Sequence, residues 1–125
     1  MATAPQFIGT PKSPTVLIAT ANTNRDGTTG TYGTLFTAGA SGSRIDRIRV
    51  NAQVSTTAGM VRFFLSDSLI LEIPVQIVTV AATTPAWYAD IIFENGLIMA
   101  AASVLKCSTE KAESIAVTVI SGGDF

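Results

Sequence analysis

Apolar and polar residues alternate most regularly over residues 47–54. Ile48 and Val50 alternate there with the charged side chains of Arg47 and Arg49. A period of two is typical of a β-strand that buries one face and exposes the other. The pattern therefore predicts a strand with an apolar inner face and arginines on its outer face.

A second alternating segment occupies residues 60–65 and follows the turn-forming residues 56–59. If those four residues form the loop of a hairpin, Ser55 pairs with Met60 and both apolar rows fall on the same side. The sequence thus predicts a hairpin between the two strands.

The outer face of this predicted hairpin is the first candidate interaction surface. Its candidate interface residues are Arg47, Arg49, Arg62 and Phe64. Arginine and aromatic side chains are enriched where protein interfaces gain their energy. The alternative is that Phe64 lies under a second sheet and that Arg47 and Arg49 are simply solvated.

Other short segments rich in β-branched or aromatic residues predict the remaining strands. They are residues 15–21, 34–37, 69–80, 87–93, 97–99, 103–109 and 114–120. Turn-formers separate them, among them residues 66–68 and Asn95-Gly96, a strong hairpin signal. Pro74 lacks a backbone donor, which predicts a sheet edge, a bulge or a crossing between sheets. About eight or nine short antiparallel strands predict an all-β, jelly-roll-like β-sandwich.

One stretch has the composition of a helix. Residues 97–112 are rich in Ala, Leu, Met, Lys and Glu, which favour helices when taken alone. We favour strands, because Asn95-Gly96 and the flanking alternation fit a hairpin, and a helix stays the alternative.

The N-terminal residues 1–14 contain three prolines around the apolar pair Phe7-Ile8. This composition predicts an extended arm that docks on another surface, with residues 15–125 forming a single domain. Phe7 and Ile8 are therefore candidate interface residues. The alternative is that residues 1–40 belong to the sandwich.

Composition narrows the class of partner. Apolar residues make up 47% of the chain and charged residues 14%, and the net charge is −1. Such an apolar chain predicts contact with another protein, whereas scattered Lys and Arg side chains argue against nucleic acid. The longest apolar run is far shorter than the roughly 20 residues of a membrane helix, and no secretion signal is expected.

The residue types give little support for catalysis. Histidine is absent, so a Ser-His-Asp or Cys-His system cannot be built. Asp90 and Glu94 share a predicted strand face about 13 Å apart, beyond the roughly 5 to 9.5 Å that cooperating carboxyls need. We expect no enzyme activity, no cofactor and no small-molecule substrate.

Two features could suggest a metal or a reactive thiol. Residues 22–27 match the first half of a calcium loop, but its twelfth position is Gly33, where a glutamate would bind the ion. Turn formation explains the same residues, so no metal is expected. Cys107 has no partner cysteine, and we expect it to be a small buried side chain.

Five segments carry a family resemblance. They are residues 42–48 (GSRIDRI), 61–67 (VRFFLSD), 105–110 (LKCSTE), 117–119 (VTV) and 123–125 (GDF). In this order they resemble small virion structural proteins of tailed bacteriophages, over about residues 40–125. The resemblance implies capsid decoration (cement) proteins, or small head or tail components, with β-sandwich folds that are commonly trimeric. It implies no active-site residues.

The resemblance leads to one expectation about function. We expect a homotrimer that binds the outside of the major capsid protein shell and stabilises it within the virion, after synthesis and assembly in the bacterial cytoplasm. The alternative is a small tail or fibre component that binds a host surface or carbohydrate through Trp87, Tyr88 or Tyr32.

Overall fold

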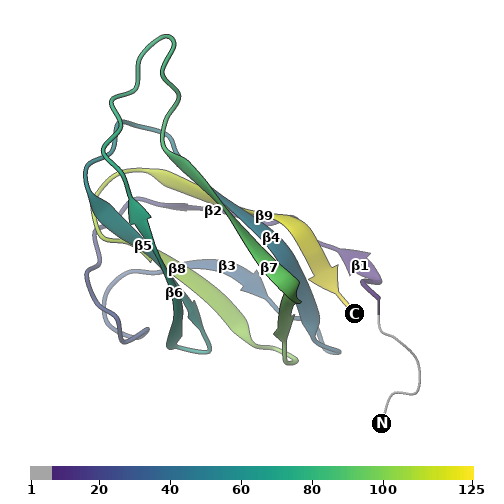
Figure 1. The fold of residues 1–125 in the computed structure, drawn as a ribbon. Helices are drawn as coiled ribbons and strands as arrows, with labels where there is room; N and C mark the ends of the chain where they lie inside the picture. Colours follow the sequence, from purple (N-terminus) through teal and green to yellow (C-terminus); the bar gives the residue numbers. More distant parts are fainter. Residues whose placement is uncertain (1–6) are drawn as a thin grey trace.

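The computed structural model describes residues 7–125 and is built of β-strands that form two packed sheets (Figure 1). The strands are β1 (Thr10–Pro11), β2 (Thr15–Ile18), β3 (Gly33–Thr37), β4 (Ser43–Ala52), β5 (Gly59–Leu65), β6 (Ser68–Val75), β7 (Tyr88–Met99), β8 (Val104–Thr109) and β9 (Ile115–Asp124). Within these residues, no helix is long and apolar enough to cross a membrane.

The strand order is that of a jelly roll. The first sheet has the order β1-β9-β4-β7, with β2 also paired to β9, and the second sheet has the order β3-β8-β5-β6. Counting from β2, the first strand pairs with the last, the second with the next to last, and so on inward. This nested pairing is that of one long antiparallel hairpin wrapped into two sheets. The predicted fold class is confirmed.

The core lies between the two sheets and follows the alternation in the sequence. Ile48 and Val50 of β4 are fully buried, as are Val61 of β5 and Val117 of β9. Each such side chain contributes roughly 1.5 to 3 kcal/mol of burial free energy. Arg49, between two of them, points to the opposite face of the first sheet.

The predicted hairpin between residues 47–54 and 60–65 is wrong. β4 pairs with β7 and β9, whereas β5 pairs with β6 and β8, so the two strands lie in opposite sheets. Residues 53–58 cross between the sheets, and Ser55 does not pair with Met60. Alternation identifies the buried face of a strand but not its neighbour, and partners on both sides of β4 replace the local hairpin.

The hairpin expected at Asn95-Gly96 is also wrong. β7 runs through this dipeptide and pairs with β4 on both sides of it, with Ile92 opposite Arg47 and Leu97 opposite Ile45. Asn95 and Gly96 have φ angles of 65° and 79°. Positive φ suits a bulge as well as a tight turn, so the dipeptide forms a bulge in a single strand. The strand prediction for residues 97–112 is confirmed, since β8 lies there.

Two local predictions are confirmed. Ser66 and Asp67 both have positive φ and form the two-residue turn between β5 and β6. Pro74 lies in β6, the edge strand of the second sheet, where its missing backbone donor breaks no ladder.

The described part of the predicted arm pairs with the chain's own C-terminal strand. The Gly9 amide donates to the Asp124 carbonyl at 2.9 Å, and the Lys12 amide donates to the Gly122 carbonyl at 3.0 Å. Residues 1–6 of the arm lie outside the described residues. From β2 onward the chain is part of the sandwich.

The connection between β6 and β7 projects from one end of the sandwich as the loop at the top of Figure 1. We call residues 76–87 the finger. Val78 pairs with Thr56 near the base of the finger, and Ala81 pairs with Thr84 at its tip. Trp87 is buried and anchors the finger to the core.

Candidate functional site

The outer face of the first sheet carries two of the candidate interface residues. Arg47 and Arg49 project from β4 toward Asp90 of β7, which is the direct cross-strand partner of Arg49. Arg49 binds both carboxylate oxygens of Asp90, with Nε–Oδ1 at 2.9 Å and Nη2–Oδ2 at 3.0 Å, and Arg47 Nη2 lies 3.1 Å from Oδ2. The side chains form a charged cluster at the centre of the face.

This cluster is held in one charge state. The hydrogen bond from Arg49, followed by the interactions with Arg47, lowers the pKa of Asp90 from 3.8 to about 2. The same hydrogen bond raises the pKa of Arg49. The Arg49 guanidinium also lies 5.1 Å from the ring centre of Tyr88, a cation–π distance. The face therefore presents arginines oriented in advance by Asp90 and Tyr88.

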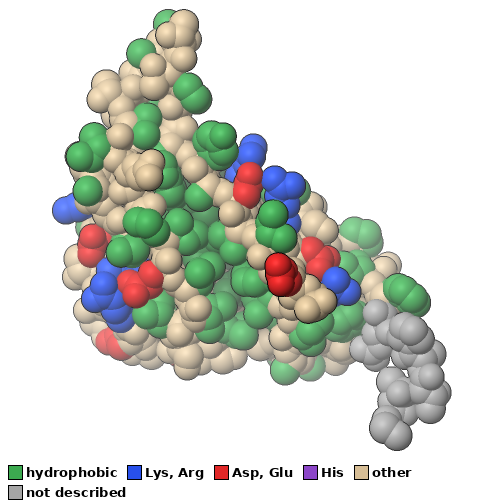
Figure 2. All heavy atoms as spheres, viewed as in Figure 1, with side chains coloured by type: hydrophobic (Ala, Val, Ile, Leu, Met, Phe, Trp, Pro, Cys, Tyr) green, Lys and Arg blue, Asp and Glu red, His purple; other side chains and the backbone are tan. Residues whose placement is uncertain are grey.

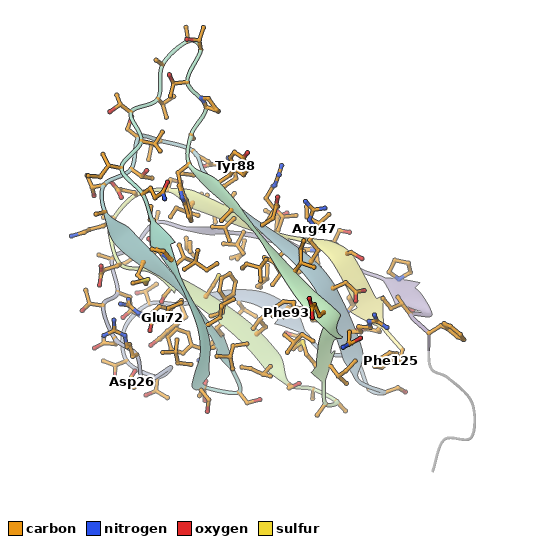
Figure 3. The ribbon with its side chains drawn as sticks, viewed as in Figure 1. Asp26, Arg47, Glu72, Tyr88, Phe93 and Phe125 are labelled. Atoms are coloured by element: carbon orange, nitrogen blue, oxygen red, sulfur yellow. The ribbon has the colours of Figure 1, made fainter. Side chains whose placement is uncertain are left out.

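Large apolar side chains surround the cluster. They are Leu17 of β2, Ile120 of β9, and Tyr88, Ile92 and Ile98 of β7, with exposed fractions between 47% and 68%. Arg47 and Tyr88 can be followed on this side of the sheet in Figure 3. We call the cluster and these residues the exposed face. Exposed aliphatic and aromatic side chains around arginines are typical of protein interfaces.

The other two candidate residues from the strands lie on the second sheet and are buried. Arg62 is 1% exposed, under the loop of residues 19–32. Its Nε lies 2.9 Å from Glu72, its Nη2 lies 3.2 Å from Glu110, and its Nη1 donates to the Asn22 carbonyl at 3.5 Å. All of its guanidinium nitrogens are engaged, so Arg62 is a structural residue.

Phe64 is fully buried beneath the same loop. The ring of Tyr32 meets it edge-on, with ring centres 5.0 Å apart and planes at 84°. Lys106 Nζ lies 4.8 Å from the ring centre of Tyr32 and also donates to the Gly27 carbonyl at 2.7 Å. The prediction of an exposed Phe64 among arginines is wrong, because a loop covers the outer face of the second sheet.

The loop holds itself in place with its own polar groups. Asp26 accepts hydrogen bonds from the backbone amides of Thr28 and Thr29 and from the Thr29 hydroxyl. These bonds, the Thr29 hydroxyl first, lower the pKa of Asp26 to about 2. The Asn22 side-chain amide donates hydrogen bonds to the carbonyls of Thr29 and Thr31. The oxygen-rich residues 22–27 thus serve the turn, as the turn interpretation expects.

The remaining candidates, Phe7 and Ile8, lie where the described chain begins. Phe7 is 78% exposed, the highest value among the large apolar residues described, and Ile8 is half-buried near Gly123. Lys12 ties the following segment to Asp124 through an ion pair of 2.9 Å. The structure therefore separates the six candidates into the exposed face, the buried side of the second sheet and the N-terminal segment.

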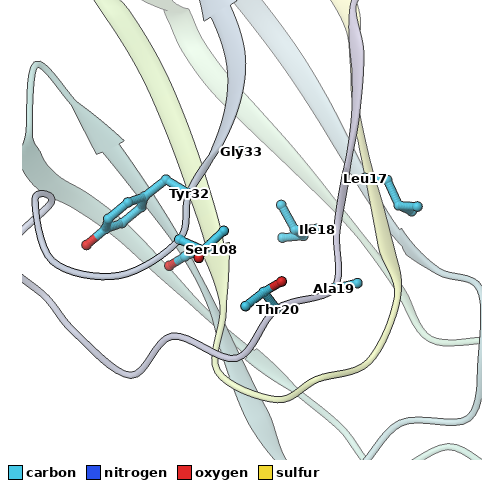
Figure 4. Close-up of a pocket in the computed structure, with 8 residues that line it drawn as sticks. Leu17, Ile18, Ala19, Thr20, Tyr32, Gly33 and Ser108 are labelled. Carbon is cyan, nitrogen blue, oxygen red and sulfur yellow. The ribbon is translucent and has the colours of Figure 1, made fainter.

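The pockets differ in size, and the larger is an open one of about 300 Å³ lined by Lys12, Ser13, Pro14, Leu35, Phe36 and Thr37. The smaller, of about 70 Å³, lies between β2 and the end of the covering loop, lined in part by Ile18, Thr20 and Ser108 (Figure 4). It has room for a few water molecules, far less than the roughly 300 to 1,000 Å³ of a typical ligand site. Cys107 is buried, as expected, and burial raises its pKa to about 12. The small cavity and Cys107 are therefore parts of the packed interior.

The sequence alone indicated Arg47, Arg49 and Tyr88 of the exposed face, but not the place of Asp90 or of the four exposed aliphatic residues. Asp90 was weighed only as a carboxylate of a possible hydrolase, because its position opposite Arg49 depends on the pairing of β4 with β7. Ile92 did leave a signal, since Ile91 and Phe93 already fill the inner face of that strand. Ile92 is thus an apolar residue on the face that alternation assigns to solvent.

Comparison of the chain with protein-family models, with curated proteins and with solved structures found no match.

Proposed function

We propose that this chain is a virion structural protein of the capsid-decoration kind, which binds the outside of the major capsid shell through its exposed face and stabilises the shell. The phage setting comes from the sequence resemblance described above. Jelly rolls are frequent among viral capsid domains, which supports the proposal by analogy of fold only.

The observation that carries the proposal is the exposed face itself. Five large apolar side chains and an ordered arginine cluster occupy one side of the sandwich, while the chain covers the corresponding side of the second sheet with its own loop. A folded domain that leaves this much apolar surface uncovered gains free energy when a partner buries it. Binding to the assembled shell in preference to free subunits stabilises the shell by mass action.

Co-sedimentation with purified shells that lack the protein tests the proposal. Wild-type protein should sediment with the shells in hundreds of copies per particle. Ile92→Asp, on the exposed face, should weaken binding at least tenfold, because a carboxylate at the contact centre must be desolvated. Ile70→Asp on β6 is the matched control, since Ile70 is 41% exposed and belongs to neither the exposed face nor the finger. No sedimentation of wild-type protein, or equal loss in both variants, would contradict the proposal.

The N-terminal segment is a second contact in the same proposal. Phe7 is exposed and Ile8 half-buried, whereas residues 9–12 are held on β9. Deleting residues 2–8 should leave the melting temperature nearly unchanged and weaken shell binding, since burial of two such side chains is worth roughly 1.5 to 3 kcal/mol each before ordering costs. Unchanged shell binding would exclude the N-terminal segment as a contact.

The tail or fibre alternative depends on aromatic residues that could stack on a sugar. Of the three proposed, Trp87 is 7% exposed within the core and Tyr32 is packed on Phe64. Tyr88 alone of the three is exposed, and it lies on the exposed face. A few to a few tens of copies per particle would favour this alternative over the shell.

A further inference from the structure

The two lateral edges of the sandwich differ. At one edge β2 packs on β3 and joins the sheets, whereas no comparable packing joins β6 and β7, both of which are fully described. Residues on the inward sides of these strands are therefore only half-buried. They are Leu71 and Ile73 of β6, and Ala89, Ile91, Phe93 and Leu97 of β7. We call this surface the open edge.

The open edge faces the viewer in Figure 2, where hydrophobic side chains occupy the space between β6 and β7. Core residues at the closed edge are better covered, since Ile18 of β2 and Phe36 of β3 are 5% and 2% exposed. The core is thus less well covered at the open edge than between β2 and β3.

The finger continues the open edge beyond the end of the sandwich. Ile77 is 72% exposed and Val80 is 42% exposed. No charged residue occurs between Glu72 and Asp90, a stretch that includes the whole finger. Figure 2 shows this projection as apolar and uncharged atoms throughout. The finger and the adjoining part of the open edge form one continuous uncharged surface, and Glu94 lies at the far end of that edge.

We propose that this surface packs against the same surface of a second copy of the chain, around a symmetry axis that runs beside β6 and β7. A surface used by every copy around one axis is complementary to itself, as closed homo-oligomers require. The proposal is independent of shell binding, which uses the outer face of the first sheet.

Charge supports this choice of partner. Glu72 and Asp90, the charges that border the uncharged stretch, are turned to the outer faces and paired with arginines. Glu94, the other charge of β7, is exposed and lies beyond Phe93 at the rim of the contact, so association leaves it in water. Burial of an unpaired charge would otherwise oppose association. Depletion of charge at the centre and polar groups at the rim are typical of homo-oligomer interfaces.

The size of the surface approaches that of a stable interface. The finger and the six residues of the open edge together bring 18 residues per copy, just below the roughly 20 to 30 residues a side of a stable interface. The finger alone would fall short. A contact between copies thus explains both the long uncharged loop and the incomplete edge.

Sedimentation velocity and light scattering at micromolar concentration test the proposal. Wild-type protein should be oligomeric. Ile77→Asp should raise the dissociation constant at least tenfold, because it places a charge in the contact, and Ile92→Asp should leave it unchanged. Melting curves followed by circular dichroism distinguish unfolding from dissociation. Because Ile77 is exposed, Ile77→Asp should fold normally.

Hydrogen exchange gives a second measurement that needs no variant. Amides of residues 76–87 should exchange faster after dilution below the dissociation constant, while those of residues 116–120 should not change. A wild-type monomer at all concentrations, or an oligomer that Ile77→Asp leaves intact, would overturn the proposal. Dissociation by Ile92→Asp alone would assign self-association to the exposed face. If Ile92→Asp stays oligomeric but no longer binds shells, that result bears on the proposed function and not on self-association.

Discussion

The outer faces of the two sheets start from similar strand sequences and end in opposite states. Both carry arginines and an aromatic residue, Arg49 and Tyr88 on the first sheet, Arg62 and Phe64 on the second. The covering loop turns the second pair into interior residues, with 1% and 0% exposure. No segment of residues 7–125 does the same for the first sheet. The same residue types are therefore interior on one face and exposed to solvent on the other.

Removing an aromatic ring should expose this difference most strongly. Phe64→Ala leaves a cavity under the loop and should lower the free energy of unfolding by about 3 to 5 kcal/mol. Ile92→Ala, on the exposed face, should change it by less than about 0.5 kcal/mol. Urea unfolding of both variants measures the contrast, and similar losses in the two would mean that the faces are equivalent.

The arginines form the next matched pair. Arg62→Ala removes a buried partner of Glu72 and Glu110 and should cost about 3 kcal/mol. Arg49→Ala breaks a solvent-exposed pair and should cost at most about 1 kcal/mol. The midpoints of chemical denaturation provide the test. A larger loss for Arg49 would show that the exposed cluster supports the fold.

Two glycines with positive φ sharpen the comparison further. A Cβ at Gly27 would clash with the backbone carbonyl of Asp67, so the loop could not approach the sheet. At Gly96 the nearest atom is Nε of the Arg44 side chain, which can move. Gly27→Ala should therefore cost about 2 kcal/mol or more, and Gly96→Ala about 1 kcal/mol, the usual strain of this backbone region. Thermal melts of both variants test the order.

The smallest expected effect concerns acid. Asp26 and Asp90 have folded pKa values of about 2, below the ordinary 3.8, so each stabilises the fold above about pH 4 and loses that contribution as the pH falls toward 2. Asp26→Asn and Asp90→Asn should each flatten the pH dependence of stability in that window. Salt at about 0.5 M should weaken the Asp90 contribution more, because charged arginines hold it, whereas hydroxyl and amide groups hold Asp26. Equal salt sensitivity would contradict this division.

The sequence predicted the parts of the fold that depend on local chemistry. Alternation at Ile48 and Val50 identified the buried face of β4, and Pro74 correctly indicated an edge. The pairing of β4 with β7 and β9 could not be predicted, because it depends on residues far apart in the chain. For the same reason, the sequence predicted a hairpin at Asn95-Gly96, where the structure has a bulge in one strand.

The candidate site was predicted in part for the same reason. Arg47 and Arg49 were found because they occupy the polar side of an alternating strand. Arg62 and Phe64 are buried because the loop of residues 19–32 covers them. The polar, glycine-rich composition of that loop does not indicate which surface it packs on. A covering loop must be located in three dimensions before a surface residue can be told from an interior one.

The bulge at residues 93–96 has a consequence for how this protein behaves when crowded. β7 is an edge strand, and a long regular edge invites further strands to add, which leads to fibrils and aggregates. The bulge interrupts the ladder along β7, and Pro74 removes a donor from β6. Both strands beside the open edge are thus blunted against backbone pairing while their side chains stay accessible. The molecule can reach high local concentration without polymerising through its sheets.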